Sequence, residues 1–215
     1  MTQDAQAALQ QAWDALWQQA GATPAPALLE RLLAAWSEPQ RQYHTLQHLG
    51  ECLANYQTLA HLPEHPLEVQ LALWFHDAIY DLGRPDNEAR SADWARAEIL
   101  AAGLPADMAD RVEALIMATC HQANPLGIDA EVVVDIDLWI LGAPAARFDE
   151  YERQVRREYG HLPEAVFRAG RIAILEQFLA RPTLYGTAEF RSRFEAKARE
   201  NLGRSLRVLR SVGAG

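Results

Sequence analysis

Residues 71–81 read LALWFHDAIYD and form the most apolar segment of the chain. As a helix over about 67–79 they present apolar side chains on nearly every side, which is typical of a central, buried helix. His76 and Asp77 stand inside this segment, although a buried aspartate is unfavourable unless it is paired or bound to a metal. Either His76 packs in the core while Asp77 caps or pairs, or both side chains are ligands of one metal ion.

Helical periodicity continues on both sides of this segment. Proline and glycine interrupt it at intervals, so further helices are expected at about 3–20, 27–36, 43–60, 87–102, 105–121 and 130–142. The remaining residues indicate two or three more helices, and the β-branched run at 132–136 leaves a short strand there as an alternative. The sequence therefore predicts an all-α fold in a single compact domain over residues 1–215.

The chain has 215 residues, with 20 basic and 29 acidic side chains and a formal net charge of −9. An acidic charge of this size repels the phosphate backbone, which disfavours general DNA binding. Cys52 and Cys120 form neither a CxxC pair nor a zinc-ribbon spacing, as in a reduced, intracellular protein. Because the N-terminal residues lack the pattern of a signal peptide and no segment is long enough to span a bilayer, we expect a cytoplasmic protein with no membrane contact.

A second polar group in helical context is the segment RQYHTLQHL at residues 41–49. His44 and His48 are one helical turn apart there, so both would project from the same face and could present two imidazoles to one site. The structural alternative is that His44 caps the helix while His48 packs in the core.

Two aspartates lie in the apolar segment VVVDIDLWILG at residues 132–142. On a helix, Asp135 and Asp137 would point about 200° apart, so they are not expected to share one site. One of them could bind a metal while the other pairs with an arginine.

In chain order these segments read H…HD…D, and here the chain resembles the HD-domain superfamily of metal-dependent phosphohydrolases over about residues 41–206. It is most similar to a bacterial subgroup of predicted HD phosphohydrolases with the motifs YHxxxH, DNExxSA and DxDLxILG. These motifs are found here at residues 43–48, 86–92 and 135–142. The resemblance implies a compact HD-type helical bundle with its motif core at about 41–142 and additional N- and C-terminal helices.

The resemblance also implies a metal centre with four ligands, which would be His48, His76, Asp77 and Asp137. Such a ligand set suits one or two divalent ions per chain, namely Mn, Fe, Co, Ni, Zn or Mg. The YHxxxH opening is also similar to that of cyclic-nucleotide phosphodiesterases, where the histidine before the metal ligand protonates the leaving oxygen. His44 is therefore the candidate general acid, and Asp77 could orient the attacking water.

Three further residues are weaker candidates. Glu88 could orient water or accept a hydrogen bond from a ligand histidine, but a glutamate in the first turn of a helix also has a structural explanation. Arg41 could bind a substrate phosphate. His121 could contact substrate or help to hold a second metal, or it could simply stabilise the end of a helix.

The resemblance, together with these residues, implies an enzyme that cleaves a phosphate ester of a nucleotide or other small phosphorylated metabolite through a metal-activated water. A di-iron HD-type oxygenase is an alternative, but it typically needs more histidines between the HD pair and the last aspartate, where only His121 lies. A non-catalytic metal- or nucleotide-binding regulatory module is another. The apolar N-terminal helices are compatible with a homodimer, and no motif indicates the substrate.

Overall fold

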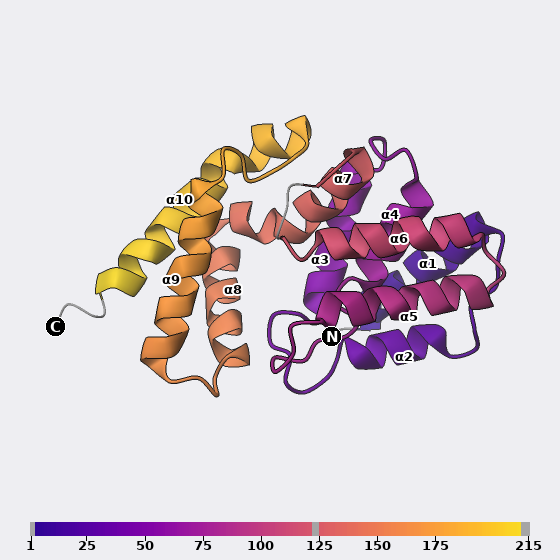
Figure 1. Cartoon of the computed structure of the whole chain (residues 1–215), viewed down its shortest axis with the longest axis horizontal. Coiled ribbons are helices and arrows are strands. Elements are labelled where there is room, and N and C mark those ends of the chain that lie inside the picture. The colour runs from indigo at the N-terminus through magenta and orange to yellow at the C-terminus, as the bar shows by residue number, and fades with distance from the viewer. Residues whose placement is uncertain (1–2, 122–124, 212–215) are drawn as a thin grey trace. The chain divides into compact units, whose positions relative to one another are not determined.

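The computed structural model describes residues 3–121 and 125–211. Within these ranges the chain forms ten α-helices, one short 3-10 helix and no strand, so the all-α prediction is confirmed (Figure 1). The alternative of a strand at 132–136 is wrong, because these residues belong to helix α7 (Ile128–Asp137). In the same described ranges, no helix combines the length and apolar character that a membrane crossing requires.

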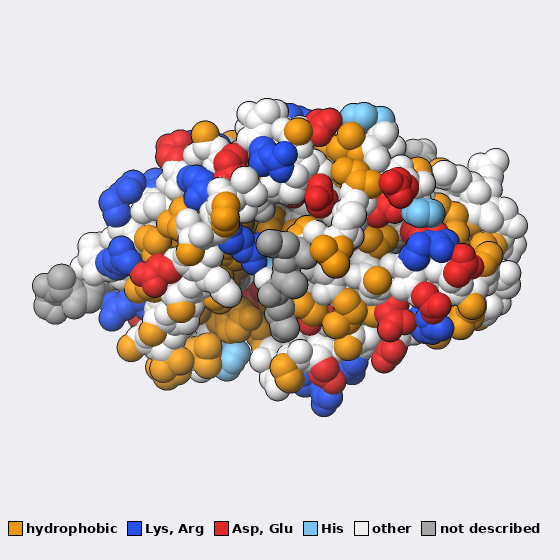
Figure 2. All heavy atoms as spheres, turned by 45° about the horizontal axis from the view of Figure 1, so that its top comes forward, with side chains coloured by type: hydrophobic (Ala, Val, Ile, Leu, Met, Phe, Trp, Pro, Cys, Tyr) orange, Lys and Arg blue, Asp and Glu red, His pale blue; other side chains and the backbone are white. Residues whose placement is uncertain are grey.

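The chain divides into two compact units, Met1–Asp137 (unit 1) and Leu138–Gly215 (unit 2), and the single domain expected over 1–215 stays a prediction. Most acidic residues lie in unit 1 and most arginines in unit 2. Figure 2 shows basic and acidic side chains interspersed with apolar ones on the face that it presents.

Unit 1 is built around one central helix. Besides α7 it contains α1 (Gln3–Ala20), α2 (Leu28–Ala35), α3 (Leu46–Leu59), α4 (Pro66–Phe75), α5 (Asn87–Ala101) and α6 (Ala106–Ala118). Helix α4 contacts α1, α3, α5, α6 and α7, which explains why nearly all of its side chains are buried. Pro66 occupies the first turn of α4, where its missing N–H has no intrahelical partner to lose.

Helix α4 ends four residues earlier than expected. Its last residue is Phe75, and the expected end near residue 79 is wrong. The amide of His76 still donates to Ala72 O at 2.8 Å, but the amide of Ala78 donates to Phe75 O in a tighter turn. The His76-Asp77 pair therefore lies at the C-terminal end of α4 and in the turn that follows, called here the HD turn (residues 76–80).

Tryptophans fill the core of unit 1 beside α4. Trp13 and Trp17 of α1 are 3% exposed, and the Trp13 ring packs edge-on against Trp74 with 5.0 Å between centroids. Trp36, directly after α2, is fully buried and its indole N–H donates to Trp74 O at 3.1 Å. These contacts attach the N-terminal helices to the central helix.

Unit 2 contains three helices and a short 3-10 segment, which packs mainly against two of them. Its elements are η1 (Leu138–Gly142), α8 (Ala145–Glu158), α9 (Glu164–Ala180) and α10 (Ala188–Ser211). A Cβ on Gly142 would lie 2.6 Å from the Cβ of Phe194, so only glycine allows α10 to approach η1 this closely. Asn201 of α10 donates to Leu141 O and Ala143 O at 2.9 Å, which ties the same two elements together.

Candidate metal centre

Four side chains from three parts of unit 1 meet at one point. His48 belongs to α3, His76 and Asp77 begin the HD turn, and Asp137 is the last residue of α7. One ligand atom of each lies within 4.8 Å of the corresponding atoms of the other three, so the group could hold a metal ion. We call it the HHDD cluster. The fold thus brings together the four residues for which the sequence predicted a metal site.

The distances within the HHDD cluster match those around a single metal ion. His48 Nε2 lies 3.2 Å from both His76 Nε2 and Asp137 Oδ1, and 3.7 Å from Asp77 Oδ2. His76 Nε2 lies 3.3 Å from Asp77 Oδ2 and 3.6 Å from Asp137 Oδ1. With metal–ligand bonds of about 2.1 Å, neighbouring ligands are about 3.0 Å apart in an octahedron and about 3.4 Å apart in a tetrahedron. Only small side-chain movements separate the cluster from a coordination shell.

The charges in the HHDD cluster favour a cation at its centre. Burial opposes the charged form of His76, but the neighbouring Asp77 and Asp137 carboxylates raise its pKa to about 9. Burial also opposes the ionisation of Asp137, yet hydrogen bonds from His121, His48 and His76 hold the pKa of that carboxyl well below its usual range. The cluster thus keeps its carboxylate ionised and attracts positive charge, as a divalent metal site requires.

A backbone carbonyl outside the HHDD cluster sets the orientation of His76. Its Nδ1 lies 2.9 Å from Leu73 O, and because a carbonyl can only accept, Nδ1 is protonated in either charge state and Nε2 faces the rest of the cluster. The Trp36 ring packs against both imidazoles, with centroids 5.5 Å from His76 and 6.1 Å from His48. The two histidines are therefore buried against an aromatic ring.

Arg41 donates hydrogen bonds to backbone carbonyls of the HD turn. Its guanidinium donates to Asp77 O at 2.7 Å and to Ala78 O at 3.0 Å, and also to His44 O at 3.1 Å. The side chain is 0% exposed and lies over the ring of Trp36. This geometry favours a structural role for Arg41 over the expected contact with a substrate phosphate.

Two residues of the DNExxSA motif hold the other side of the HD turn. Asn87 Oδ1 accepts from the amide of Asp81 at 3.0 Å, and its Nδ2 donates to Asp81 O at 2.9 Å. Ser91 Oγ accepts from the amide of Ile79 at 3.0 Å. The motif thus connects the start of α5 to the turn that carries the metal ligands, a role that its sequence alone does not reveal.

His44 lies beside the cluster but outside helix α3. The helix begins at Leu46, with Thr45 as its N-cap, so the expected position of both histidines on one helical face is wrong. The His44 ring is nevertheless 5.9 Å from that of His48, and it stacks on Tyr80 of the HD turn at 4.3 Å. Its place next to a metal ligand is compatible with the expected acid, whose role stays a prediction.

Asp135 and Glu88 lie outside the HHDD cluster. Asp135 is 0% exposed and belongs to the buried side of α7, in line with the opposite directions expected for the two aspartates. Glu88 lies in the first turn of α5, and its charge adds to the effect of burial in raising the pKa of Cys120. The role expected of Glu88 in orienting water stays a prediction.

Cys52 is a neighbour of the cluster that the sequence reading did not single out. It follows His48 by one turn of α3, and the two histidines and this thiol form a second group within 4.8 Å of one another. Its Sγ lies 3.7 Å from Nε2 and 3.8 Å from Nδ1 of His48. Since a sulfur equidistant from both nitrogens lies beside the ring rather than along a lone pair, Cys52 packs against His48 in this conformation.

His121 contacts the cluster from a different side. Its Nε2 lies 3.0 Å from Oδ2 of Asp137, whereas Oδ1 of the same carboxylate faces His48. The sequence is compatible with a substrate contact, a second metal or a helix-end role for His121. The structure places it against Asp137 of the HHDD cluster.

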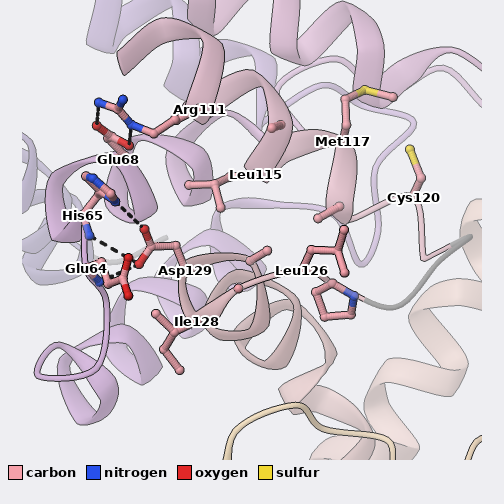
Figure 3. A pocket seen from close by; sticks show the side chains of 15 residues that line it. Glu64, His65, Glu68, Arg111, Leu115, Met117, Cys120, Leu126, Ile128 and Asp129 are labelled. Atoms are coloured by element: carbon pink, nitrogen blue, oxygen red, sulfur yellow. Dashed lines mark hydrogen bonds and ion pairs between the residues drawn. The ribbon is translucent and has the colours of Figure 1, made fainter. Parts of the chain in front are cut away.

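A separate cavity of about 580 Å³ lies at the start of α4, beside α6 and α7 (Figure 3). On its wall, His65 pairs with Asp129 at 2.8 Å, and Arg111 forms two hydrogen bonds with Glu68 at 2.7 and 2.8 Å. None of the four HHDD residues is among the described residues that line it. Glu64 lines the same cavity, so acidic side chains outnumber the single arginine there and the wall does not favour a phosphate.

Comparisons of the chain with protein-family models, with curated proteins and with solved structures found no significant match.

Proposed function

We propose that the chain is a metal-dependent phosphohydrolase of the HD type that cleaves a nucleotide or another small phosphate ester. The observation that carries the proposal is the HHDD cluster, in which two imidazoles and two carboxylates from distant parts of unit 1 converge within 4.8 Å. Mixed nitrogen and oxygen donors of this kind suit Mn, Fe, Co, Ni, Zn or Mg, and the identity of the ion belongs to the proposal. Bound there, a divalent ion would polarise a phosphoryl oxygen and activate a water molecule.

The side chains around the cluster have distinct tasks in this proposal. His48, His76 and Asp137 hold the ion, and they are oriented by α3, the HD turn and α7. Asp77 is also a ligand, and its carboxylate orients the attacking water. His44, stacked on Tyr80, donates a proton from its imidazole to the departing alkoxide oxygen.

The first test is metal binding by two aspartate variants. Asp137→Asn should weaken manganese binding by more than roughly 100-fold, because the loss of a ligand exceeds the 10–100-fold effect typical of its hydrogen-bonding partners. Asp135→Asn is the matched control, since Asp135 is buried on the same helix but outside the cluster. Calorimetric titration of the folded variants would measure both affinities, and equal affinities would contradict the site.

The second test is turnover. The wild-type protein, loaded in turn with Mn, Fe, Co, Ni, Zn and Mg, should release inorganic phosphate from at least one member of a panel of nucleotides and sugar phosphates. Asp137→Asn should abolish that release, whereas Asp135→Asn should retain it in proportion to its folded fraction. Metal binding with iron-dependent oxygen uptake and no phosphate release would instead indicate the oxygenase, and metal binding with neither activity would indicate a regulatory module.

A further inference from the structure

His121 has a backbone conformation that its residue type disfavours. Helix α6 ends at Ala118, and the amides of Cys120 and His121 close its last turn on Met117 O and Ala118 O. His121 then adopts a φ of 55°, in the left-handed region. Helices commonly end with a residue in this region, but that residue is usually glycine, which has no Cβ to clash. A histidine here carries a steric penalty that glycine would avoid.

The side chain of His121 explains why the strained position is used. Its Nε2 lies 3.0 Å from Asp137 Oδ2, and because an ionised carboxylate can only accept, the ring nitrogen donates. The other oxygen, Oδ1, lies 3.2 Å from His48 Nε2. The two oxygens of the Asp137 carboxylate thus have different partners. Oδ1 faces His48 of the HHDD cluster, and Oδ2 accepts the hydrogen bond from His121.

We infer that His121 is a positioning residue of the metal centre, which fixes the carboxylate of Asp137 so that Oδ1 faces the ion. From this left-handed position at the end of α6, the imidazole contacts Asp137, the last residue of α7. Strained backbone at a functional position is commonly retained when the side chain it presents is needed. The inference rests on the metal centre of the proposed function, but it does not depend on which substrate is hydrolysed.

A second residue of the chain provides a matched control. Within the described ranges, His121 and Ala27 are the non-glycine residues with positive φ, and the φ of Ala27 is 60°. Ala27 precedes α2 and belongs to neither metal-ligating group. Ala27→Gly therefore relieves the same kind of backbone strain without removing a contact to the HHDD cluster.

Three substitutions at His121 distinguish the effect of its backbone strain from the effect of its side-chain donor. His121→Gly relieves the backbone strain and removes the donor of the hydrogen bond to Asp137. His121→Asn accepts the left-handed conformation, but its shorter amide does not reach Asp137 Oδ2. His121→Gln places an amide nitrogen at about the position of Nε2 and keeps the donor.

The experiment measures Co²⁺ affinity by titration and the visible d–d spectrum of the bound ion, which reports on ligand geometry. We expect His121→Gly and His121→Asn to bind Co²⁺ roughly 10–100-fold more weakly with an altered spectrum, as is typical when a partner that orients a ligand is lost. The Co²⁺ affinity of His121→Gln should stay within about threefold of the wild-type affinity, because the donor is kept. Ala27→Gly should match wild type in both measurements.

Four results would overturn the inference. Unchanged Co²⁺ affinity in His121→Gly with a raised KM for a phosphate ester would make His121 a substrate contact. A drop from two bound Co²⁺ ions to one, with the remaining affinity unchanged, would make it a ligand of a second ion. An equal loss in His121→Gln and His121→Gly would exclude the donated hydrogen bond as the cause. If wild type binds no Co²⁺, the metal centre itself fails, whereas Co²⁺ binding without phosphate release removes only the hydrolase.

Discussion

At the scale of single residues, the HHDD cluster resolves a conflict that the sequence already contains. His76 and Asp77 are polar residues inside the most apolar segment, and His76 is only 1% exposed. A buried charge is unfavourable unless a partner compensates it. Here the compensation comes from within the cluster, because protonated His76 balances the carboxylates and a divalent ion could replace that proton.

The raised pKa of His76 predicts that the stability of the metal-free protein depends on pH. The pKa of His76 is about 9 in the folded state against an ordinary value of 6.5. A raised pKa of a base stabilises the fold fully below pH 6.5, and that stabilisation is lost as the pH rises through about 9. The loss is on the order of 3 kcal/mol when 2.5 pKa units are converted at 1.36 kcal/mol each.

Chemical denaturation in the presence of a chelator, at intervals from pH 6 to 9, would measure this loss. The variant His76→Gln, which lacks the titrating imidazole, should show a much flatter dependence over the same range. If wild type and His76→Gln lose stability in parallel, His76 is not the group responsible.

At the scale of elements, the end of helix α4 is the feature that builds the site. The helix ends at Phe75, and backbone groups beyond that residue have hydrogen-bond partners outside the helix. Arg41 binds Asp77 O and Ala78 O, and Ser91 accepts from the amide of Ile79. The HD turn is therefore held by side chains from segments before and after α4.

This arrangement predicts that Arg41 is needed for both stability and metal binding. Arg41→Gln should lower the free energy of unfolding by roughly 3 kcal/mol, because buried carbonyls left without donors cost about 1–3 kcal/mol each. The metal affinity of the folded fraction should fall about tenfold as the turn loosens. Denaturant melts and metal titration would measure the two effects.

Arg84→Gln is the control for Arg41→Gln. Arg84 pairs with Asp86 in the loop after the HD turn, and its side chain is half exposed. Its loss should leave stability and metal affinity unchanged, since exposed ion pairs contribute little. Equal effects of the two substitutions would mean that Arg41 acts only through its charge.

At the scale of the whole molecule, all four HHDD ligands belong to unit 1. Unit 2 holds most of the arginines and its own core around η1, but it contributes none of these ligands. A ligand that binds only the native state stabilises the part of the fold that forms its site. Metal binding should therefore stabilise the two units unequally.

Hydrogen–deuterium exchange should show this inequality directly. Manganese at 100 times its Kd should stabilise the site by about 2.7 kcal/mol, and amides of α3, α4 and α7 should exchange correspondingly more slowly. Amides of α9 and α10 should exchange as they do in the presence of a chelator. Equal protection of α9 would show instead that the two units unfold together.

Much of the candidate site could be predicted from the sequence, because its ligands belong to short motifs in strongly periodic segments. The order of His48, His76-Asp77 and Asp137 was legible, and helical geometry correctly separated Asp135 from Asp137. The positions of helix ends could be predicted less well where they depend on hydrogen bonds to residues distant in sequence. Arg41 and Ser91 determine where α4 ends, and neither contact leaves a signal in local periodicity.

The sequence by itself determined the all-α class and the buried central helix, because the hydrophobic period is a local property, and its resemblance to a family motif pointed to the four residues of the HHDD cluster. The tertiary structure alone decided the features that depend on long-range contacts. It placed His44 before its helix, buried Arg41 beneath the HD turn, and set His121 in a left-handed conformation against Asp137. These outcomes follow from which carbonyls, amides and carboxylates the folded chain brings within hydrogen-bonding distance, and no local pattern encodes that proximity.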